Sequence, residues 1–272
     1  MKKLLLLILL ISPSVHATDC YHCTLWNFND VLPNVEIPEW PVEFIKVEKE
    51  DYPRNDKASY CTRPPEMIDT VVIHHSETSE KATPQEINTI HLNRGTTSDP
   101  WYMIAYSFVI NSSYPGNKQP EAKLTEGRPL NVVGAHAGSG AFVTMDEDQQ
   151  KMWDEGKIVC GKTGGPFAVD LKQVKNGKIK ANVTTIGVVV SGNYAAFGRF
   201  NPNGYSWSKP RHPTQSTLEM AAKMSCQLQK KYPKIKYIKW HSLYNATTCP
   251  GNLRLHIEKI KKIAKGYGCD FK

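Results

Sequence analysis

Two runs rich in β-branched residues set the strongest limit on what this chain can fold into. The first is DTVVIHHS at 69–76, and the second is TTIGVVVSGNY at 184–194. Short continuous apolar runs of this kind are typical of strands that are buried on both faces of a sheet. Both runs end in polar residues, so side chains that could take part in chemistry follow directly at the strand ends. The sequence therefore predicts an α/β fold.

Helical and strand patterns alternate around these two runs. A helix is expected over 82–95, where Thr83 is an N-cap candidate, Pro84 takes the first helical position and Gly95 ends the pattern. The other predicted elements are strands at 101–110 and 235–241, a short strand within 127–138, a long amphipathic helix at 213–233 and a final helix at 253–267. This order predicts one main domain, at 66–272, with a mixed central β-sheet flanked by helices.

The first 17 residues have the parts of a secretory signal peptide. Lys2 and Lys3 precede an unbroken apolar run at 4–11, and Ala17 ends a segment suited to cleavage. This run is too short to cross a bilayer, which needs about 20 apolar residues. We therefore expect an exported protein, periplasmic or secreted, with no stable membrane anchor. A retained anchor is the alternative.

The chain has seven cysteines, which after export would meet an oxidising compartment where thiols tend to pair. Because seven is odd, one cysteine is expected to have another role, and the sequence does not choose among the pairings of the others. Cys20, Cys23 and Cys61 lie in a Cys/Pro-rich extension at 18–65. We expect this extension to be tied by disulfides and packed on the main domain. Half of a zinc ribbon is the alternative for the first two cysteines, but no second Cys-x2-Cys pair exists.

Residues 139–183 interrupt the alternating pattern with a long polar insertion, in which a short helix is expected near 145–154. Within it, GKIVCGKT at 156–163 matches the phosphate-binding loop motif. That motif needs a buried strand before it and a helix after it, and neither pattern is present. We therefore expect no nucleotide ligand.

Basic residues are concentrated at the end of the chain. The formal net charge is +8, and the segment from Ser208 onward has 14 Lys and Arg against 3 Asp and Glu. An anionic partner fits this distribution, and in an exported protein an anionic envelope polymer fits better than nucleic acid, which we do not expect. A solvated, lysine-rich helix face is the alternative.

The segment WHSLYNATTCPGNL at 240–253 contains a histidine at the end of a predicted strand and a cysteine on the loop that follows it. Imidazole and thiolate are zinc ligands, and catalytic zinc sites typically have three protein ligands and one open position. His241 and Cys249 supply two such ligands. The third is expected from His74 or His75, which end another core strand. Side chains alternate along a strand, so one of the pair should reach the site and the other should not.

Six blocks of the sequence follow one family in order and wording. They are VVIHHS, IAYSFVI, EGRPLNVVGAHAG, TTIGVVVSGNY, PTQ and WHSLYNATTCPG. Over roughly 66–265 the chain resembles the zinc N-acetylmuramoyl-L-alanine amidases of the type-2 amidase and peptidoglycan-recognition-protein superfamily. The resemblance implies a hydrolase that binds peptidoglycan or muropeptides and cuts the amide bond between N-acetylmuramic acid and L-alanine.

The resemblance also implies roles for particular residues. His74, His241 and Cys249 would bind one Zn²⁺ ion, which selects His74 over His75. Tyr106 would be a catalytic residue; without the resemblance, core packing is the better interpretation of its position. Thr247 would be catalytic as well.

His136 and Arg128 would lie near the substrate by the same resemblance. The insertion and the N-terminal extension depart from the family's minimal fold, which leaves stem-peptide specificity open. Two other functions also stay open: a non-catalytic peptidoglycan-binding module, and a cysteine hydrolase that uses Cys249. We expect a monomer.

Overall fold

A computed structural model describes residues 47–55, 58–94, 101–112, 121–138, 140–162, 174–195 and 212–272. The chain divides into two compact units, Met1–Ile37 and Pro38–Lys272, and the described residues all belong to the second. The predicted signal peptide and the cysteines at 20 and 23 therefore lie outside the described residues. In the described part, no helix combines the length and the apolar character needed to cross a bilayer.

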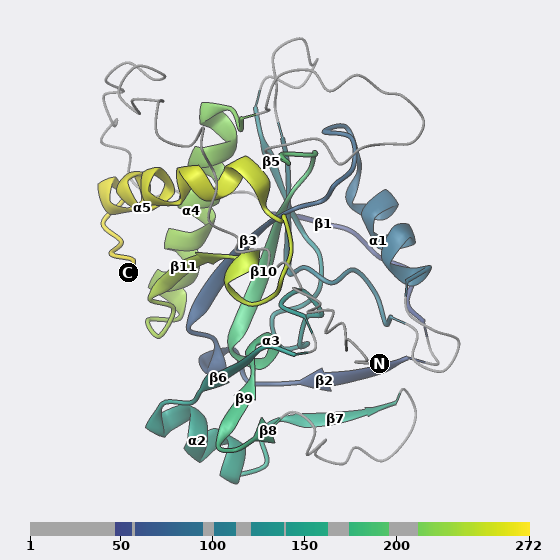
Figure 1. Cartoon of the computed structure of the whole chain (residues 1–272), viewed down its shortest axis with the longest axis vertical. Helices are drawn as coiled ribbons and strands as arrows, with labels where there is room; N and C mark the ends of the chain where they lie inside the picture. Colours follow the sequence, from purple (N-terminus) through teal and green to yellow (C-terminus); the bar gives the residue numbers. More distant parts are fainter. Residues whose placement is uncertain are drawn as a thin grey trace, which may run out of the picture. The chain divides into compact units, whose positions relative to one another are not determined.

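A six-stranded sheet forms the centre of the second unit (Figure 1). In spatial order its strands are β1 (Val47–Lys49), β5 (Lys123–Glu126), β4 (Phe108–Asn111), β10 (Thr185–Val190), β3 (Thr70–His75) and β11 (Tyr237–Trp240). All neighbouring strands run parallel except β4 and β5, which are antiparallel. The mixed central sheet that the sequence predicts is confirmed, and one of its edge strands, β1, comes from the N-terminal extension.

The two β-branched runs form the neighbouring inner strands β3 and β10, and every residue of both is buried. They pair in parallel, with His74 beside Val189 and His75 beside Val190. Ile73 belongs to the apolar cluster on one face of the sheet. Since side chains alternate along a strand, His74 points to the opposite face.

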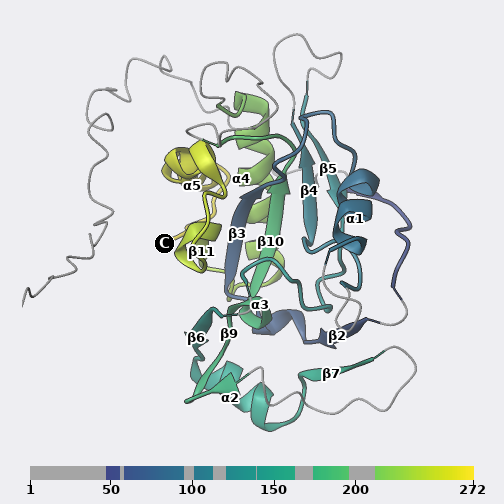
Figure 2. The ribbon, with the colours of Figure 1, turned by 45° about the vertical axis from the view of Figure 1, so that its right-hand side comes forward.

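Helices cover both faces of this sheet (Figure 2). On one face lie α4 (Gln215–Lys231) and α5 (Ile257–Gly266), whose apolar side chains pack with those of β3 and β10. On the other face lies α1 (Pro84–Leu92), where Ile87 packs in a cluster with Val109 and Val189. A 3-10 helix, η4 (Gly251–His256), leads into α5. The flanking helices are thus where the sequence predicts them.

The start of α1 agrees with its sequence signal. The hydroxyl of Thr83 accepts a hydrogen bond from the backbone of Glu86, and the Glu86 carboxylate accepts one from the backbone of Thr83. This reciprocal pair satisfies two backbone donors that the first turn leaves free. The helix ends at Leu92, however, and not at Gly95.

The strand predicted at 101–110 is wrong for most of its length, because only its last residues belong to β4. The backbone N–H of Ile104 donates to Oδ1 of Asn88 at 2.6 Å, and that of Ala105 donates to Nδ1 of His91 at 3.0 Å. Side chains of α1 therefore take hydrogen bonds that a neighbouring strand would otherwise supply. A sequence pattern contains no sign of this tertiary contact.

The short strand predicted within 127–138 is also displaced, since β5 ends just before this range. Within the range, the described residues form turns and one isolated bridge between Thr62 and Val132.

The insertion has secondary structure of its own. β6 (Phe142–Thr144), β9 (Lys178–Lys180) and β8 (Val174–Lys175) form a three-stranded antiparallel sheet, while α2 (Glu147–Asp154) confirms the predicted short helix. β7 (Val159–Lys162) pairs with β2 (Ser59–Thr62) of the N-terminal extension, and α3 (Ala181–Thr184) leads directly into β10. The insertion is therefore joined both to the extension and to the central sheet.

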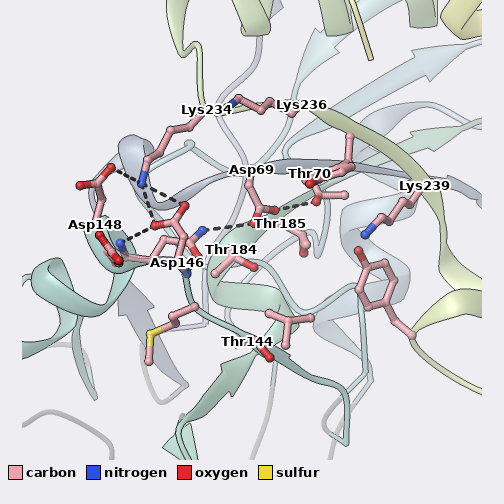
Figure 3. Close-up of a pocket in the computed structure, with 16 residues that line it drawn as sticks. Asp69, Thr70, Thr144, Asp146, Asp148, Thr184, Thr185, Lys234, Lys236 and Lys239 are labelled. Carbon is pink, nitrogen blue, oxygen red and sulfur yellow. Dashed lines mark hydrogen bonds and ion pairs between the residues drawn. The ribbon is translucent and has the colours of Figure 1, made fainter. Parts of the chain in front are cut away.

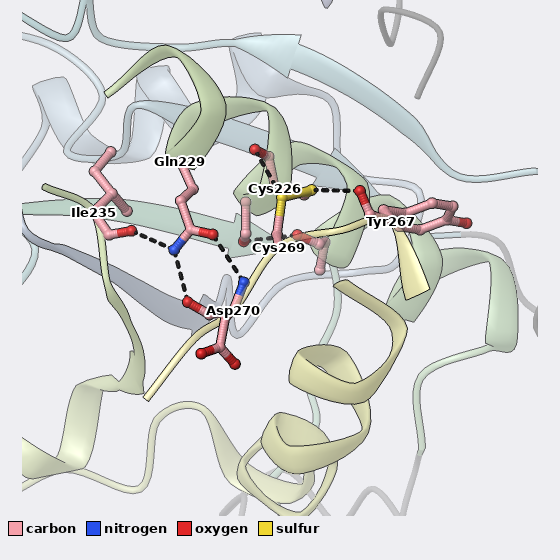
Figure 4. Close-up of a disulfide and its surroundings, with 8 residues drawn as sticks. Cys226, Gln229, Ile235, Tyr267, Cys269 and Asp270 are labelled. Carbon is pink, nitrogen blue, oxygen red and sulfur yellow. Dashed lines mark hydrogen bonds between the residues drawn. A yellow bond between two sulfur atoms is a disulfide. The ribbon is translucent and has the colours of Figure 1, made fainter. Parts of the chain in front are cut away.

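Two disulfides link distant segments. Cys61 of β2 bonds to Cys160 of β7, where the two residues face each other in the antiparallel pair. Cys226 of α4 bonds to Cys269 after α5, which fixes the C-terminal segment beside α4 (Figure 4). Among the described cysteines, only Cys249 is free, as expected for the odd cysteine.

Candidate metal and catalytic site

The carboxyl end of β3 places its two histidines in different surroundings. His75 is buried, and its Nδ1 accepts a hydrogen bond from the backbone of Tyr194 at 3.0 Å. His74 is fully buried on the other face, with its ring centroid 4.5 Å from that of His241. The structure therefore brings His74, and not His75, to the other two predicted ligands. This agrees with the alternation that the strand pattern predicts.

His241 follows the last residue of β11 and begins the short 3-10 helix η3 (His241–Leu243). The loop after η3 returns Cys249 to the end of β3, where the backbone N–H of His75 donates to its Sγ at 3.4 Å. Gly251 permits this return, since it has φ +61° and an added Cβ would lie 2.0 Å from the carbonyl oxygen of Tyr194. Strand, loop and glycine together place the thiol beside the histidine rings.

The side chains of His74, His241 and Cys249 converge on one point, with one ligand atom of each within 4.8 Å of the others. Nδ1 of His74 lies 3.6 Å from Sγ of Cys249. Tetrahedral zinc with ordinary bond lengths separates nitrogen and sulfur ligands by about 3.5 Å. Both ring nitrogens of His241 are buried and have no hydrogen-bond partner among the described residues, and coordination to a cation would satisfy one of them. The donor set fits Zn²⁺ and leaves one coordination position for a reactant.

Burial governs the protonation of these groups. It lowers the pKa of His241 to about 4, with a further contribution from His75, and lowers the pKa of His74 well below its ordinary value. Both imidazoles are thus neutral near pH 7, the form that binds a metal. Burial raises the pKa of the Cys249 thiol to about 12, because a thiolate is poorly stabilised in apolar surroundings. A cation at this point would offset that cost.

Each of the two predicted catalytic residues contacts one candidate ligand. The ring centroid of Tyr106 lies 5.0 Å from that of His74. Burial and the neighbouring Cys249 raise the pKa of Tyr106, so its phenol remains a hydrogen-bond donor at neutral pH. Oγ1 of Thr247 accepts a hydrogen bond from the backbone of Cys249 at 3.2 Å, and its hydroxyl hydrogen is not used in that bond.

His136 also lies at this site, in contact with the candidate ligand His74. It is 3 % exposed, and its Nδ1 lies 3.1 Å from Nε2 of His74. Burial lowers the pKa of His136 to about 3. Its contact is therefore with a candidate ligand, and a burial this deep does not suit a side chain that meets substrate directly.

Arg128 does not join the site. Its side chain is 4 % exposed, and its three nitrogens donate to the carbonyl oxygens of Met103, Ile104 and Val133 at 2.5–2.9 Å. All of these bonds are to backbone that carries Tyr106 or the turn before His136. The structure thus gives Arg128 a role in holding these segments, in place of the predicted contact with substrate.

Sequence reasoning missed His91 of α1. Its Nδ1 holds the backbone of Ala105, and its ring centroid lies 5.3 Å from that of Tyr106. In the sequence, His91 is distinguished only by its position on a predicted helix. That signal is too weak to predict a contact with Tyr106.

A pocket of about 660 Å³ opens on the same face of the sheet, toward the beginnings of β3 and β10 (Figure 3). The insertion supplies one wall, from Val143 to Gln149, and β11 supplies Lys239 on the other. Lys234 pairs with Asp146 at 2.9 Å and with Asp148 at 3.0 Å. Among the described residues no ion pair involves Lys239, and its Nζ lies 4.6 Å from the ring centroid of Tyr237.

Comparisons with known proteins find several similar structures. The structure is similar to N-acetylmuramoyl-L-alanine amidase LysC from Clostridium intestinale URNW, with 22% identity and a TM-score of 0.45, over 80% of this chain and 95% of that one. Bumblebee PGRP-SA has 18% identity and a TM-score of 0.46, over 79% of this chain and 94% of that one. The Ph2119 endolysin from Thermus scotoductus MAT2119 bacteriophage Ph2119 has 15% identity and a TM-score of 0.39, over 72% of this chain and 84% of that one. A comparison with curated proteins gives no match.

A family model described as N-acetylmuramoyl-L-alanine amidase matches residues 63–252, which include all seven predicted site residues. The match spans well over half of the chain. The chain therefore belongs to the N-acetylmuramoyl-L-alanine amidase family known as Amidase_2.

Proposed function

We propose that this protein is an exported, zinc-dependent hydrolase that cleaves the amide bond between the lactyl group of N-acetylmuramic acid and L-alanine in peptidoglycan. One observation carries the proposal. His74, His241 and Cys249, from three separate segments, present two imidazoles and one thiol within 4.8 Å of one another. Such a set is costly to bury unless it has a partner, and its composition suits catalytic zinc.

Zinc in such a site supplies Lewis acidity, which activates water and polarises the scissile carbonyl. The chain's own residues orient and stabilise the reacting groups. The Tyr106 phenol, kept protonated by its raised pKa, donates a hydrogen bond to the oxygen that gains negative charge. Thr247 donates a second from its hydroxyl. Donors fixed in place before the reaction stabilise the transition state more than the substrate.

The pocket on the same face of the sheet is the proposed place for the stem peptide. Lys239 lies on β11, two residues before His241, which directly follows that strand. Peptide stems carry carboxylates a short distance beyond the bond to be cut. The Lys239 ammonium, on the wall opposite the paired Lys234, is placed to bind one of them.

The disulfides support the exported location, since such bonds persist in oxidising compartments. The sequence features of a signal peptide agree with this proposal. A periplasmic or secreted protein of this kind meets peptidoglycan or muropeptides directly, and we propose that it acts as a monomer.

Mass spectrometry of products from defined muropeptides tests the proposed reaction. The wild-type protein should release intact stem peptides that begin with L-alanine, and Cys249→Ala should release none. Tight binding of sacculi by a zinc-loaded wild-type protein without release of peptide would instead establish a binding module.

Inhibition by chelation or by thiol alkylation distinguishes the metal mechanism from the cysteine-hydrolase alternative. Reversible loss of activity on chelation, with recovery on addition of Zn²⁺, supports the metal mechanism. Activity that survives chelation and disappears on thiol alkylation would assign the reaction to Cys249 as a nucleophile. The burial of Cys249, 6 % exposed with a raised pKa, supports the metal mechanism.

A further inference from the structure

We propose that His136 is a positioning residue, which fixes the ring and tautomer of His74 so that Nδ1 of His74 faces the metal. This inference rests on the proposed function, because it assigns His136 a role toward the metal site. It replaces the expected contact between His136 and substrate. Three hydrogen bonds form a continuous network from the backbone of α3 to the His74 ring.

This hydrogen-bond network begins at the hydroxyl of Thr185, which donates to the carbonyl oxygen of Ala181 at 2.7 Å. Its hydrogen is therefore used. Nε2 of His136 lies 3.2 Å from this Oγ1 and 3.4 Å from the carbonyl oxygen of the same residue. Both neighbours of this nitrogen can only accept, so Nε2 of His136 carries the hydrogen.

The direction of the next bond follows. In a neutral imidazole one nitrogen donates and the other accepts, so Nδ1 of His136 is the acceptor. Nε2 of His74, 3.1 Å away, must then donate to it. The hydrogen of His74 is thereby held on Nε2, and the lone pair of Nδ1 is left free. This is the nitrogen that lies 3.6 Å from Sγ of Cys249.

The position of His136 is itself fixed by two glycines. A Cβ added to Gly187 of β10 would lie 2.7 Å from Cγ of the His136 ring, and one added to Gly134 would lie 2.8 Å from its Cδ2. Contacts under 3.0 Å are essentially never seen for real Cβ atoms. Glycine at both positions lets the imidazole lie flat against the strand, edge-on to His74 with ring planes at 89°.

The backbone of His136 is also held. Oδ1 of Asn182 accepts hydrogen bonds from the backbone N–H groups of His136 at 3.0 Å and Ala137 at 2.7 Å. Asn182 and Thr185 lie in and directly after α3, the segment by which the insertion enters β10. The end of the insertion thus supports the histidine that orients a metal ligand. Partners of this kind typically alter metal affinity by 10–100-fold when removed.

The test compares His136→Ala with His136→Asn, using the full mature chain. The Asn carbonyl oxygen can occupy nearly the position of Nδ1 and still accept from His74, whereas Ala cannot. His212→Asn serves as a matched control, since His212 contacts His256 and lies outside this site. Zinc dissociation constants are measured by competition with a chromophoric chelator, after circular dichroism has shown that each variant is folded.

We expect the dissociation constant to rise about 10–100-fold for His136→Ala, and to stay within a few-fold of wild type for His136→Asn and His212→Asn. Nitrogen-15 NMR of the metal-free wild type should show His74 protonated on Nε2. Wild-type affinity in His136→Ala, or a hydrogen on Nδ1 of His74, would overturn the inference. Failure of the wild type to bind zinc would instead refute the metal site of the proposed function, while the tautomer measurement would still decide the hydrogen-bond order.

Discussion

Sγ of Cys249 lies 3.6 Å from Nδ1 of His74, although the two residues are 175 positions apart in the chain. The fold brings them together because β11 runs parallel to β3 and the loop after η3 returns to the carboxyl end of β3. Removing the thiol should therefore remove a ligand and not merely a buried side chain. We expect Cys249→Ala to lose zinc almost completely, as measured by metal analysis after dialysis.

A second variant separates ligation from packing at this position. Cys249→Asp keeps an anionic donor that zinc accepts, so it should retain more zinc than Cys249→Ala. Equal zinc contents in the wild type and Cys249→Ala would show that the thiol is not a ligand.

Tyr106 should affect the chemical step without affecting the metal. Tyr106→Phe keeps the ring beside His74 but removes the hydroxyl that donates to the developing oxyanion. Loss of one such donor typically costs a factor of about 10²–10³ in kcat. We expect this decrease in steady-state kinetics on a defined muropeptide, with unchanged zinc content and little change in KM. An unchanged kcat would show that Tyr106 serves in core packing and not in catalysis.

Lys239 should affect substrate binding in a charge-dependent way. Lys239→Gln removes the ammonium from the pocket wall, and hydrogen bonds to charged groups contribute about 1.5–3 kcal/mol. We expect KM to rise by about 10–100-fold for muropeptides with free stem carboxylates, and much less for amidated ones. Lys236→Gln, at an exposed position on the same pocket, is the matched control. Equal effects on both substrates would contradict carboxylate binding.

The sequence predicts the fold class well, while its metal ligands remain a prediction that the geometry supports. Continuous β-branched runs indicate buried strands directly, whereas the choice of His74 over His75 depends on the family resemblance and is supported by the geometry. Arg128 shows what a sequence cannot supply. The resemblance implies a place near the substrate, but its three nitrogens donate to backbone carbonyls of other segments. Only the tertiary structure contains that information.

The same limit explains the elements that were predicted at the wrong place. The apolar pattern at 101–110 is typical of a strand, yet Asn88 and His91 on α1 bind the backbone of its middle part, and the strand begins only at Phe108. The pairing of β2 with β7, from the extension and the insertion, is likewise a long-range contact without a local signal.

Acid should destabilise the metal-free protein through its buried histidines, of which His91 and His256 are not candidate metal ligands. Burial lowers the pKa of His91 to about 3 and that of His256 to about 4, whereas both are near 6.5 when unfolded. Between those values the unfolded state binds more protons, so the free energy of unfolding falls as pH falls. Urea denaturation after chelation should show lower stability at pH 5 than at pH 7. His91→Asn should reduce this difference, and a pH-independent midpoint would contradict the assignment.

The disulfide between Cys61 and Cys160 should stabilise the joined extension and insertion. It closes a loop between residues separated by 99 positions, and loss of a native disulfide typically costs about 2–5 kcal/mol. Replacing both cysteines with serine should lower Tm in calorimetry. Because this bond lies in the β2–β7 pair and the metal ligands are on other segments, zinc affinity should change much less than stability. Loss of zinc binding at a temperature where the variant is still folded would show that the extension supports the metal site directly.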